Sequence, residues 1–318
     1  MTGSTQHSLK LRHSFYLLLA AFLWGTTFVA QSIATDLIGP FTYNAARFFL
    51  GSAVLLPLAI VTGRIDPLAA NYRGSEIPGI SRNRSSRIRD LAIGGIACGL
   101  CLFLAGGFQQ IGIIYTTAGK SGFVTALYII LVPVIGLFFH RKSSPMIWAA
   151  ILIAVAGFYL LCVTEDLSIN RGDVITLGSS FMFACHILTI DHFSPRVNGI
   201  QLSCVQFFTA GMLSLIPAFL LETPSFAVML NSWMPICYAG ILSSGVAYTL
   251  QIIGQRGIHP TVASLLMSLE SVISVLSGWL ILGDAMSLRE IAGCALVFAG
   301  VILAQLPSRS SAENAEAV

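Results

Sequence analysis

The sequence predicts an all-α membrane protein in which ten transmembrane helices form two inverted five-helix repeats around a central cavity. Three observations support this prediction. Of the 318 residues, 55% are hydrophobic and only 10% are charged, whereas soluble globular chains carry about 25% charged residues. Apolar runs long enough to cross a bilayer occur about ten times. The two halves of the chain also share an ordered set of motifs.

The apolar runs account for most of the chain. The first run follows Lys10, Arg12 and His13, as in a secretory signal peptide. It is long for such a peptide and its pattern recurs later, so we expect a retained helix. The predicted spans are 15–34, 41–62, 91–115, 119–139, 145–163, 174–193, 200–221, 232–254, 261–282 and 287–306.

Positive charge is distributed unevenly between the two sides of this predicted bundle. Residues 63–90 form the longest hydrophilic segment, which is rich in arginine and predicts a solvated loop. Alternating the loops places thirteen Lys and Arg on the side of the N-terminus and three on the other. Both tails, 1–14 and 307–318, are therefore expected to lie in the cytoplasm, and the helices in a cell or inner membrane. The arginine segment either only sets this topology or also contacts anionic lipids.

The charge and cysteine content narrow the range of partners. A formal net charge of +3 gives no indication of a nucleic-acid partner. The seven cysteines lie in apolar segments, which argues against a disulfide framework. Cys98 and Cys101 form a C-x-x-C motif without a second pair, so a packing role is favoured over metal or redox chemistry. We expect a lipid bilayer and a small-molecule substrate as partners, no metal site and no cofactor; the sequence leaves a homodimer open.

The chain is an internal duplication, with a first repeat at 15–163 and a second at 174–306. The corresponding pairs are Leu18–Val29 with Leu177–Leu188, Arg47 with Gln206, Gln109 with Gln251, and Tyr128 with Glu270. An odd number of helices per repeat places the second copy upside down relative to the first. Inverted repeats are typical of secondary transporters, which bind substrate near the midplane between the repeats.

Glu270 is the single carboxylate of the predicted span Thr261–Leu282 and lies near its midpoint. A carboxylate at that depth costs a few kcal/mol or more, so intramembrane acids usually face a cavity or a partner. Two interpretations stay open. Glu270 is either a substrate contact or proton carrier, or a buried hydrogen-bonding group that holds two helices together.

Motifs spread over residues 15–306 resemble the EamA branch of the drug/metabolite transporter superfamily. They are Leu23-Trp24-Gly25-Thr26-Thr27-Phe28, Arg47, Thr116-Thr117-Ala118-Gly119-Lys120-Ser121-Gly122-Phe123, Leu127-Tyr128, Leu269-Glu270 and Leu282-Gly283-Asp284. The resemblance implies two EamA repeats and export or exchange of small metabolites such as amino acids, nucleobases, sugars or drugs. It also implies a cavity lined by the first, third, fourth, sixth, eighth and ninth helices, with the fifth and tenth peripheral.

This chain departs from the family pattern next to the central carboxylate. Ser271 follows Glu270 where the family usually has proline, which predicts a straighter ninth helix. Basic residues 140–142 replace the usual acid after the fourth helix, and Asp284 stands where Glu is common.

Two basic residues are further site candidates. Lys120 opens the fourth helix, where it is either a cation for an anionic substrate group or a lysine that extends to the interface. Arg47 lies about two turns into the second helix, in a structural or coupling role. It could extend outward to the interface, or pair with Asp36 or a buried carbonyl.

Aromatic and imidazole side chains complete the predicted substrate site. Trp24, Tyr128 and Tyr248 could stack on an aromatic or heterocyclic substrate, although membrane helices carry such residues in any case. His186 is polar at mid-depth and could relay protons, with packing as the favoured alternative.

The sequence favours a transporter over an enzyme. Gly119-Lys120-Ser121 resembles the end of a phosphate-binding loop, but Ile114 stands where that motif needs glycine. No histidine is a convincing base for a serine nucleophile in this segment. We therefore predict a secondary transporter of a small polar or amphipathic metabolite working by efflux or exchange. The alternative is an intramembrane enzyme or a lipid-handling protein.

Overall fold

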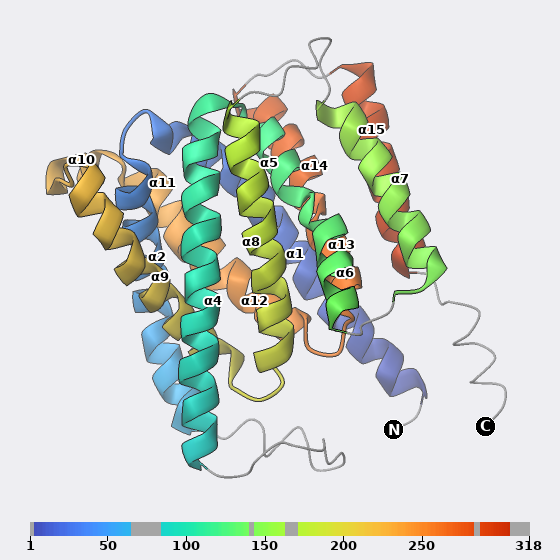
Figure 1. The fold of residues 1–318 in the computed structure, drawn as a ribbon, viewed down its shortest axis with the longest axis horizontal. Coiled ribbons are helices and arrows are strands. Elements are labelled where there is room, and N and C mark those ends of the chain that lie inside the picture. Colours follow the sequence, from blue (N-terminus) through green and yellow to red (C-terminus); the bar gives the residue numbers. More distant parts are fainter. Residues whose placement is uncertain (1–2, 65–83, 140–142, 163–170, 283–286, 306–318) are drawn as a thin grey trace.

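A computed structural model describes residues 3–64, 84–139, 143–162, 171–282 and 287–305. Throughout these residues the regular structure is helical, without a strand (Figure 1), which confirms the all-α prediction. Several residues of the sequence analysis lie outside the described ranges. They are the middle of the arginine segment, the basic residues 140–142, Asp284 and the tail 307–318.

The helices follow the predicted spans closely. The first half contains α1 (Gly3–Thr35), α2 (Pro40–Arg64), α4 (Arg84–Gly112), the 3-10 turn η1 (Ile113–Tyr115), α5 (Ala118–Ala126), α6 (Tyr128–Phe138) and α7 (Pro145–Cys162). The second half contains α8 (Arg171–Phe193), α9 (Gly199–Leu221), α10 (Phe226–Asn231), α11 (Trp233–Cys237), the π-helix η2 (Tyr238–Tyr248), α12 (Thr249–Gly254), α13 (Pro260–Met267), α14 (Leu269–Ser277), the π-helical turn η3 (Gly278–Leu282) and α15 (Leu288–Gln305).

Within the described residues, eight helical segments are long and apolar enough to cross a membrane. The helices α7 and α15 contain shorter apolar stretches, Pro145–Leu160 and Ile291–Gln305. Large apolar side chains on the outside of the bundle are exposed, for example Phe219 at 69% and Leu280 at 70%. Such a surface suits contact with lipid. The chain is a multi-pass membrane protein, while the count of ten spans stays a prediction.

One predicted loop boundary is wrong. The helix α4 begins at Arg84, so the last residues of the predicted loop 63–90 are helical. The helix α1 likewise begins at Gly3, inside the predicted tail. Hydropathy marks only the part of a helix that suits the hydrocarbon core, whereas polar residues can continue the same helix into water.

Helices from the two halves of the chain pack against each other in pairs. The helix α2 packs on α9, α7 on α15, and α4 on both α8 and α9. Figure 1 shows α7 and α15 side by side at one edge of the bundle. A Cβ atom at Gly157 of α7 would lie 2.6 Å from the carbonyl oxygen of Gly293 on α15. This close backbone approach requires glycine.

Glu222 joins α9 to the start of α2. Its carboxylate accepts hydrogen bonds from the backbone N–H groups of Phe41 and Thr42, both at 2.8 Å. These N–H groups have no partner within their own helix because they lie in its first turn. Glu222 therefore fixes the end of α9 in the second half against the start of α2 in the first half.

Two of the spans are interrupted near their centres. The fourth breaks at Leu127, between α5 and α6, and the ninth at Ser268, between α13 and α14. In the fourth, the hydroxyl of Ser180 on α8 donates a hydrogen bond to the Val124 carbonyl. A side chain that enters the helical hydrogen-bond ladder in this way can bend the helix.

The ninth helix is interrupted at Ser268 although Ser271 stands where the family usually has proline; a helix straighter than in relatives stays a prediction. Ser268 and Ser271 donate their hydroxyls to the carbonyls of the residues three positions earlier, Leu265 and Ser268, both at 2.8 Å. Ser264 and Ser274 make the same kind of bond. Serine bonds of this type compete with the regular ladder and bend helices, so the interruption arises without a proline.

Candidate functional site

The centre of the bundle contains a cavity that is lined by both halves of the chain. Together with the solvent-open space that it joins, it holds about 430 Å³ without protein atoms. The lining residues are Trp24, Phe28, Gln31, Arg47, Gln109, Thr125, Tyr128, Phe183, Ser243, Tyr248, Gln251, Met267 and Glu270. All the helices that the family resemblance implied contribute to this wall, and α2 adds Arg47. None of the lining residues belongs to α7 or α15.

The two helix interruptions bring equivalent residues to the cavity. Tyr128 is the first residue of α6, directly after the break at Leu127. Glu270 lies in the first turn of α14, directly after the break at Ser268. The carboxyl group is 5% exposed, and its Oε1 atom has no hydrogen-bond partner. It is therefore available to a solute or to water in the cavity.

Arg47 reaches the same cavity from α2. Its side chain is 2% exposed, so the alternative in which it extends outward to the interface is wrong. The guanidinium carbon lies 4.7 Å from the centroid of the Phe48 ring and 5.4 Å from that of Tyr43, which are cation–π contacts. The structure describes no ion pair between Arg47 and Asp36, and the Nε atom has no hydrogen-bond partner.

Aromatic rings form one wall of the cavity. The rings of Trp24 and Tyr248 meet edge to face with their centroids 4.7 Å apart. Behind Tyr248 lie Phe207, at 5.6 Å, and His186, at 5.8 Å. His186 does not line the cavity, and its Nε2 atom lies 3.0 Å from Oε1 of Gln206. The structure thus places His186 as support for the Tyr248 ring.

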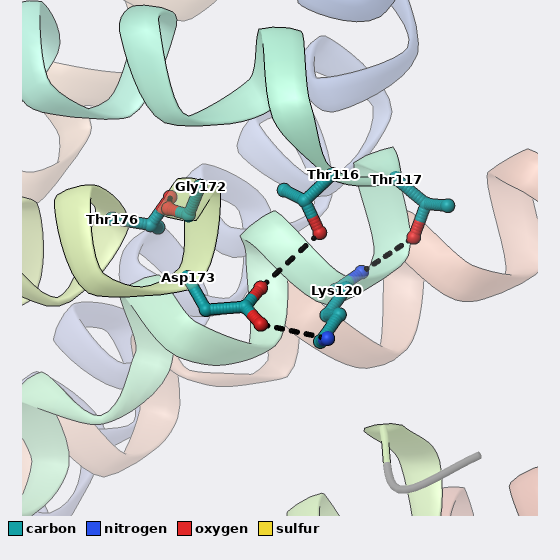
Figure 2. Close-up of polar contacts among 6 residues, drawn as sticks. All are labelled: Thr116, Thr117, Lys120, Gly172, Asp173 and Thr176. Atoms are coloured by element: carbon teal, nitrogen blue, oxygen red, sulfur yellow. Dashed lines mark hydrogen bonds and ion pairs between the residues drawn. The ribbon is translucent and has the colours of Figure 1, made fainter. Parts of the chain in front are cut away.

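Lys120 lies away from the cavity, at the start of α5. Figure 2 shows its ammonium group paired with Asp173 in the first turn of α8, with Nζ 2.7 Å from Oδ2. Thr116 donates its hydroxyl to the other oxygen of Asp173 at 3.3 Å, and Thr117 accepts a bond from the Lys120 backbone N–H. This cluster links the segment between α4 and α5 to α8. A substrate-binding role for Lys120 stays a prediction.

Six polar atoms of the cavity wall lack a hydrogen-bond partner, although they are buried. They are Nε1 of Trp24, Oε1 of Gln31, Nε of Arg47, the Tyr128 hydroxyl, Oε1 of Gln251 and Oε1 of Glu270. Buried polar groups in proteins are almost always paired. A set of donors and acceptors that faces one cavity therefore indicates a binding site for a polar solute.

Sequence reasoning missed the glutamines of this site. Gln31, Gln109 and Gln251 line the cavity, and Gln109 corresponds to Gln251 in the internal repeat. That correspondence was the available signal, because a polar side chain that recurs in two apolar spans indicates a shared position.

The described residues contain little that points to metal or enzyme chemistry. No group of three His, Cys, Asp or Glu side chains is placed to hold a metal ion within them. The hydroxyl of Ser121, the serine considered as a nucleophile, is buried without a hydrogen-bond partner. A serine nucleophile needs a base within hydrogen-bond reach.

Comparisons with known proteins agree on a transporter fold. A model of the EamA-like transporter family matches residues 12–163 and 170–306. An uncharacterized transporter of Archaeoglobus fulgidus is 27% identical over 305 residues, which cover 96% of this chain and 89% of that protein. The uncharacterized transporter YwfM of Bacillus subtilis is 24% identical over 316 residues, with 96% and 97% covered.

Two further similarities concern location and fold. The uncharacterized inner membrane transporter YedA of Escherichia coli K12 is 22% identical over 290 residues, with 89% of this chain and 87% of that protein covered. One solved crystal structure superposes with a TM-score of 0.73 at 20% identity, covering 94% of this chain and 98% of the other. At that identity the likeness shows a shared fold.

Proposed function

Because this chain belongs to the EamA-like transporter family, we propose that it is a secondary transporter that carries a small polar or amphipathic metabolite by alternating access. The family and the names of the relatives indicate transport rather than catalysis. The observation that carries the proposal is the central cavity. There a carboxyl group, a guanidinium and four other unpartnered polar groups face one space between the two halves.

An inverted pair of five-helix repeats is part of this proposal. Four residues that correspond in the two halves, Gln109 with Gln251 and Tyr128 with Glu270, line the same cavity. The pairing of α2 with α9 and of α7 with α15 is the pattern expected when the two copies are related by a pseudo-two-fold axis. In such transporters the two repeats rock about a central site.

We place the protein in the inner or plasma membrane with both termini in the cytoplasm. The excess of Lys and Arg on the side of the N-terminus supports this orientation. The start of α1 and the end of α15 also lie toward the same end of the bundle (Figure 1). The proposed activity is efflux or exchange of an amino acid, a nucleobase or a drug-like solute.

The test is a ligand screen on the purified full-length protein, followed by flux measurements. Thermal unfolding is recorded with amino acids, nucleobases, sugars, polyamines and vitamins. A ligand at 100 times its Kd stabilises the folded state by about 2.7 kcal/mol, which gives a measurable shift. Hits are then tested for saturable uptake into proteoliposomes.

Two variants show whether a hit uses the cavity. Glu270→Gln changes the cavity wall, whereas Asp36→Asn changes an exposed carboxylate directly after α1. We expect a hit to stabilise the wild type and Asp36→Asn equally, and to stabilise Glu270→Gln less. Absence of flux for every solute would contradict the proposed substrates, and a covalently altered product would favour the enzyme alternative.

A further inference from the structure

The cavity is lined by one guanidinium and one carboxyl group, from Arg47 and Glu270. Arg47 comes from α2 in the first half and Glu270 from α14 in the second. Both side chains are at least nine-tenths buried, and each keeps an atom without a hydrogen-bond partner. The structure describes no ion pair between them. A charge left unpaired at this depth costs several kcal/mol. The guanidinium therefore favours an anionic ligand group, and Glu270 in its carboxylate form favours a cationic one.

The surroundings of Arg47 leave part of its guanidinium available. The aromatic rings of Phe48 and Tyr43 contact it through cation–π geometry. The Nε atom of Arg47 has no hydrogen-bond partner, and a carboxylate binds at the edge of a guanidinium through parallel N–H groups. Gly106 of α4 makes room for this side chain, because a Cβ atom there would lie 3.1 Å from Nη2 of Arg47.

Part of the cavity wall is aromatic or apolar. Trp24 and Tyr248 form an edge-to-face pair, and Phe28, Phe183 and Met267 also line the cavity. Such surfaces bury apolar or aromatic parts of a ligand while a few polar groups fix its orientation. The cavity therefore combines two charge-bearing positions with an apolar wall.

We propose that the substrate is a small zwitterion whose anionic group binds the guanidinium of Arg47 and whose ammonium group binds Glu270. The apolar part of the molecule packs against Trp24 and Tyr248. This inference rests on the proposed transport function and makes Arg47 a substrate-binding residue. Because the two charged residues belong to different halves of the chain, such a ligand joins the halves when it is bound.

The experiment compares ligands that differ in one charge. The zwitterions are L-phenylalanine, L-methionine, L-serine and taurine. Phenylalaninamide lacks the anionic group, and N-acetylphenylalanine lacks the ammonium. Affinities are measured by calorimetry on the purified full-length protein. We expect the best zwitterion to bind, and removal of either charge to weaken phenylalanine binding about 10- to 100-fold.

The variants assign each charge to its residue. In Arg47→Gln, phenylalanine and phenylalaninamide should bind alike, while N-acetylphenylalanine is still rejected. In Glu270→Gln, phenylalanine and its N-acetyl derivative should bind alike, while the amide is still rejected. Arg47→Lys keeps the positive charge and should retain part of the preference for a carboxylate. Each comparison is between ligands on one variant, so a general loss of folding does not imitate the expected pattern.

Distinct results overturn this inference and the transport function. If the wild type binds none of the four zwitterions, or if Arg47→Gln keeps the full preference for phenylalanine over its amide, the zwitterion inference is wrong. If another class of solute binds and is carried into proteoliposomes, and Glu270→Gln reduces that flux, the transport function is supported although the zwitterion inference is wrong. A protein that carries no solute of any class contradicts the transport function itself. If Arg47→Gln does not fold, binding of phenylalaninamide to the wild type as tightly as phenylalanine also overturns the inference.

Discussion

At the scale of single residues, Glu270 combines burial with access to the cavity. Its Oε1 atom has no hydrogen-bond partner, so the second interpretation, a hydrogen-bonding group that only holds helices together, gains no support from that oxygen. Three other titratable or charged groups face the same cavity: Arg47 on α2, Tyr128 on α6 and Tyr248 on η2. Among these four side chains, Glu270 is the one best suited to take up and release a proton during transport.

The first prediction concerns the dependence of transport on pH. Glutamine has nearly the shape of glutamate but carries no titratable proton. In proteoliposomes, the wild type should therefore transport at a rate that changes with pH, and Glu270→Gln should transport slowly at a rate independent of pH. Glu270→Asp, which retains a carboxyl group, should recover pH dependence. A Glu270→Gln variant with the wild-type rate and pH profile would remove the proton-carrier role.

The sequence predicted part of this site, for identifiable physical reasons. A lone acid in an apolar span is costly, so Glu270 stood out, and the structure places it with Trp24, Tyr128 and Tyr248 in the cavity wall. Arg47 was harder to assign because a basic residue near a helix end can extend to the interface or turn inward with similar sequence surroundings. The aromatic rings that hold it inward, Phe48 and Tyr43, act through packing that a single sequence does not show.

At the scale of elements, the spans were predictable and their interruptions were not. Apolar length sets where a helix crosses a bilayer, so the positions of the helices follow from composition. The break at Leu127 depends on a serine of another helix, Ser180. At the break at Ser268, the hydroxyls of Ser268 and Ser271 donate to backbone carbonyls three residues earlier. Both depend on hydrogen bonds that the apolar pattern does not specify.

The second prediction concerns the ion pair between α5 and α8. Lys120 and Asp173 are 2.7 Å apart, and Lys120 does not line the cavity. We therefore expect Lys120→Gln and Asp173→Asn to lower the free energy of unfolding by similar amounts, about 1 kcal/mol or less each because Lys120 is partly exposed. Thermal unfolding measures this change. The double variant should lose no more unfolding free energy than the two single variants lose together. In all three variants, ligand affinity should change less than threefold.

The Lys120 measurement distinguishes its two roles. If Lys120 binds an anionic substrate group, Lys120→Gln should weaken binding by about tenfold or more, whereas Asp173→Asn should leave binding intact. Such a difference between the two single variants would identify Lys120 as a substrate-binding residue. Equal, small effects of both on affinity would support a role in joining α5 to α8 (Figure 2).

At the scale of the whole molecule, the two halves contribute jointly to one cavity. Arg47 and Gln109 come from the first half, and Gln251 and Glu270 from the second. Neither half alone encloses the site, so binding and the relative position of the halves must be coupled. A ligand that contacts both halves stabilises the arrangement in which they are close, which is the energetic requirement for a solute to drive a change of access.

The third prediction is the orientation of the bundle in the membrane. Thirteen of the Lys and Arg residues lie on the side of the N-terminus when the predicted loops alternate, against three on the other side. With an even number of spans, a fluorescent protein fused to the C-terminus should fold in the cytoplasm and fluoresce, while alkaline phosphatase at the same point should be inactive. Alkaline phosphatase fused after Glu222, which lies between α9 and α10, should be active. An active C-terminal phosphatase would mean an odd number of spans or a reversed bundle. The fusion after Glu222 separates these cases, because in a reversed bundle it would be inactive.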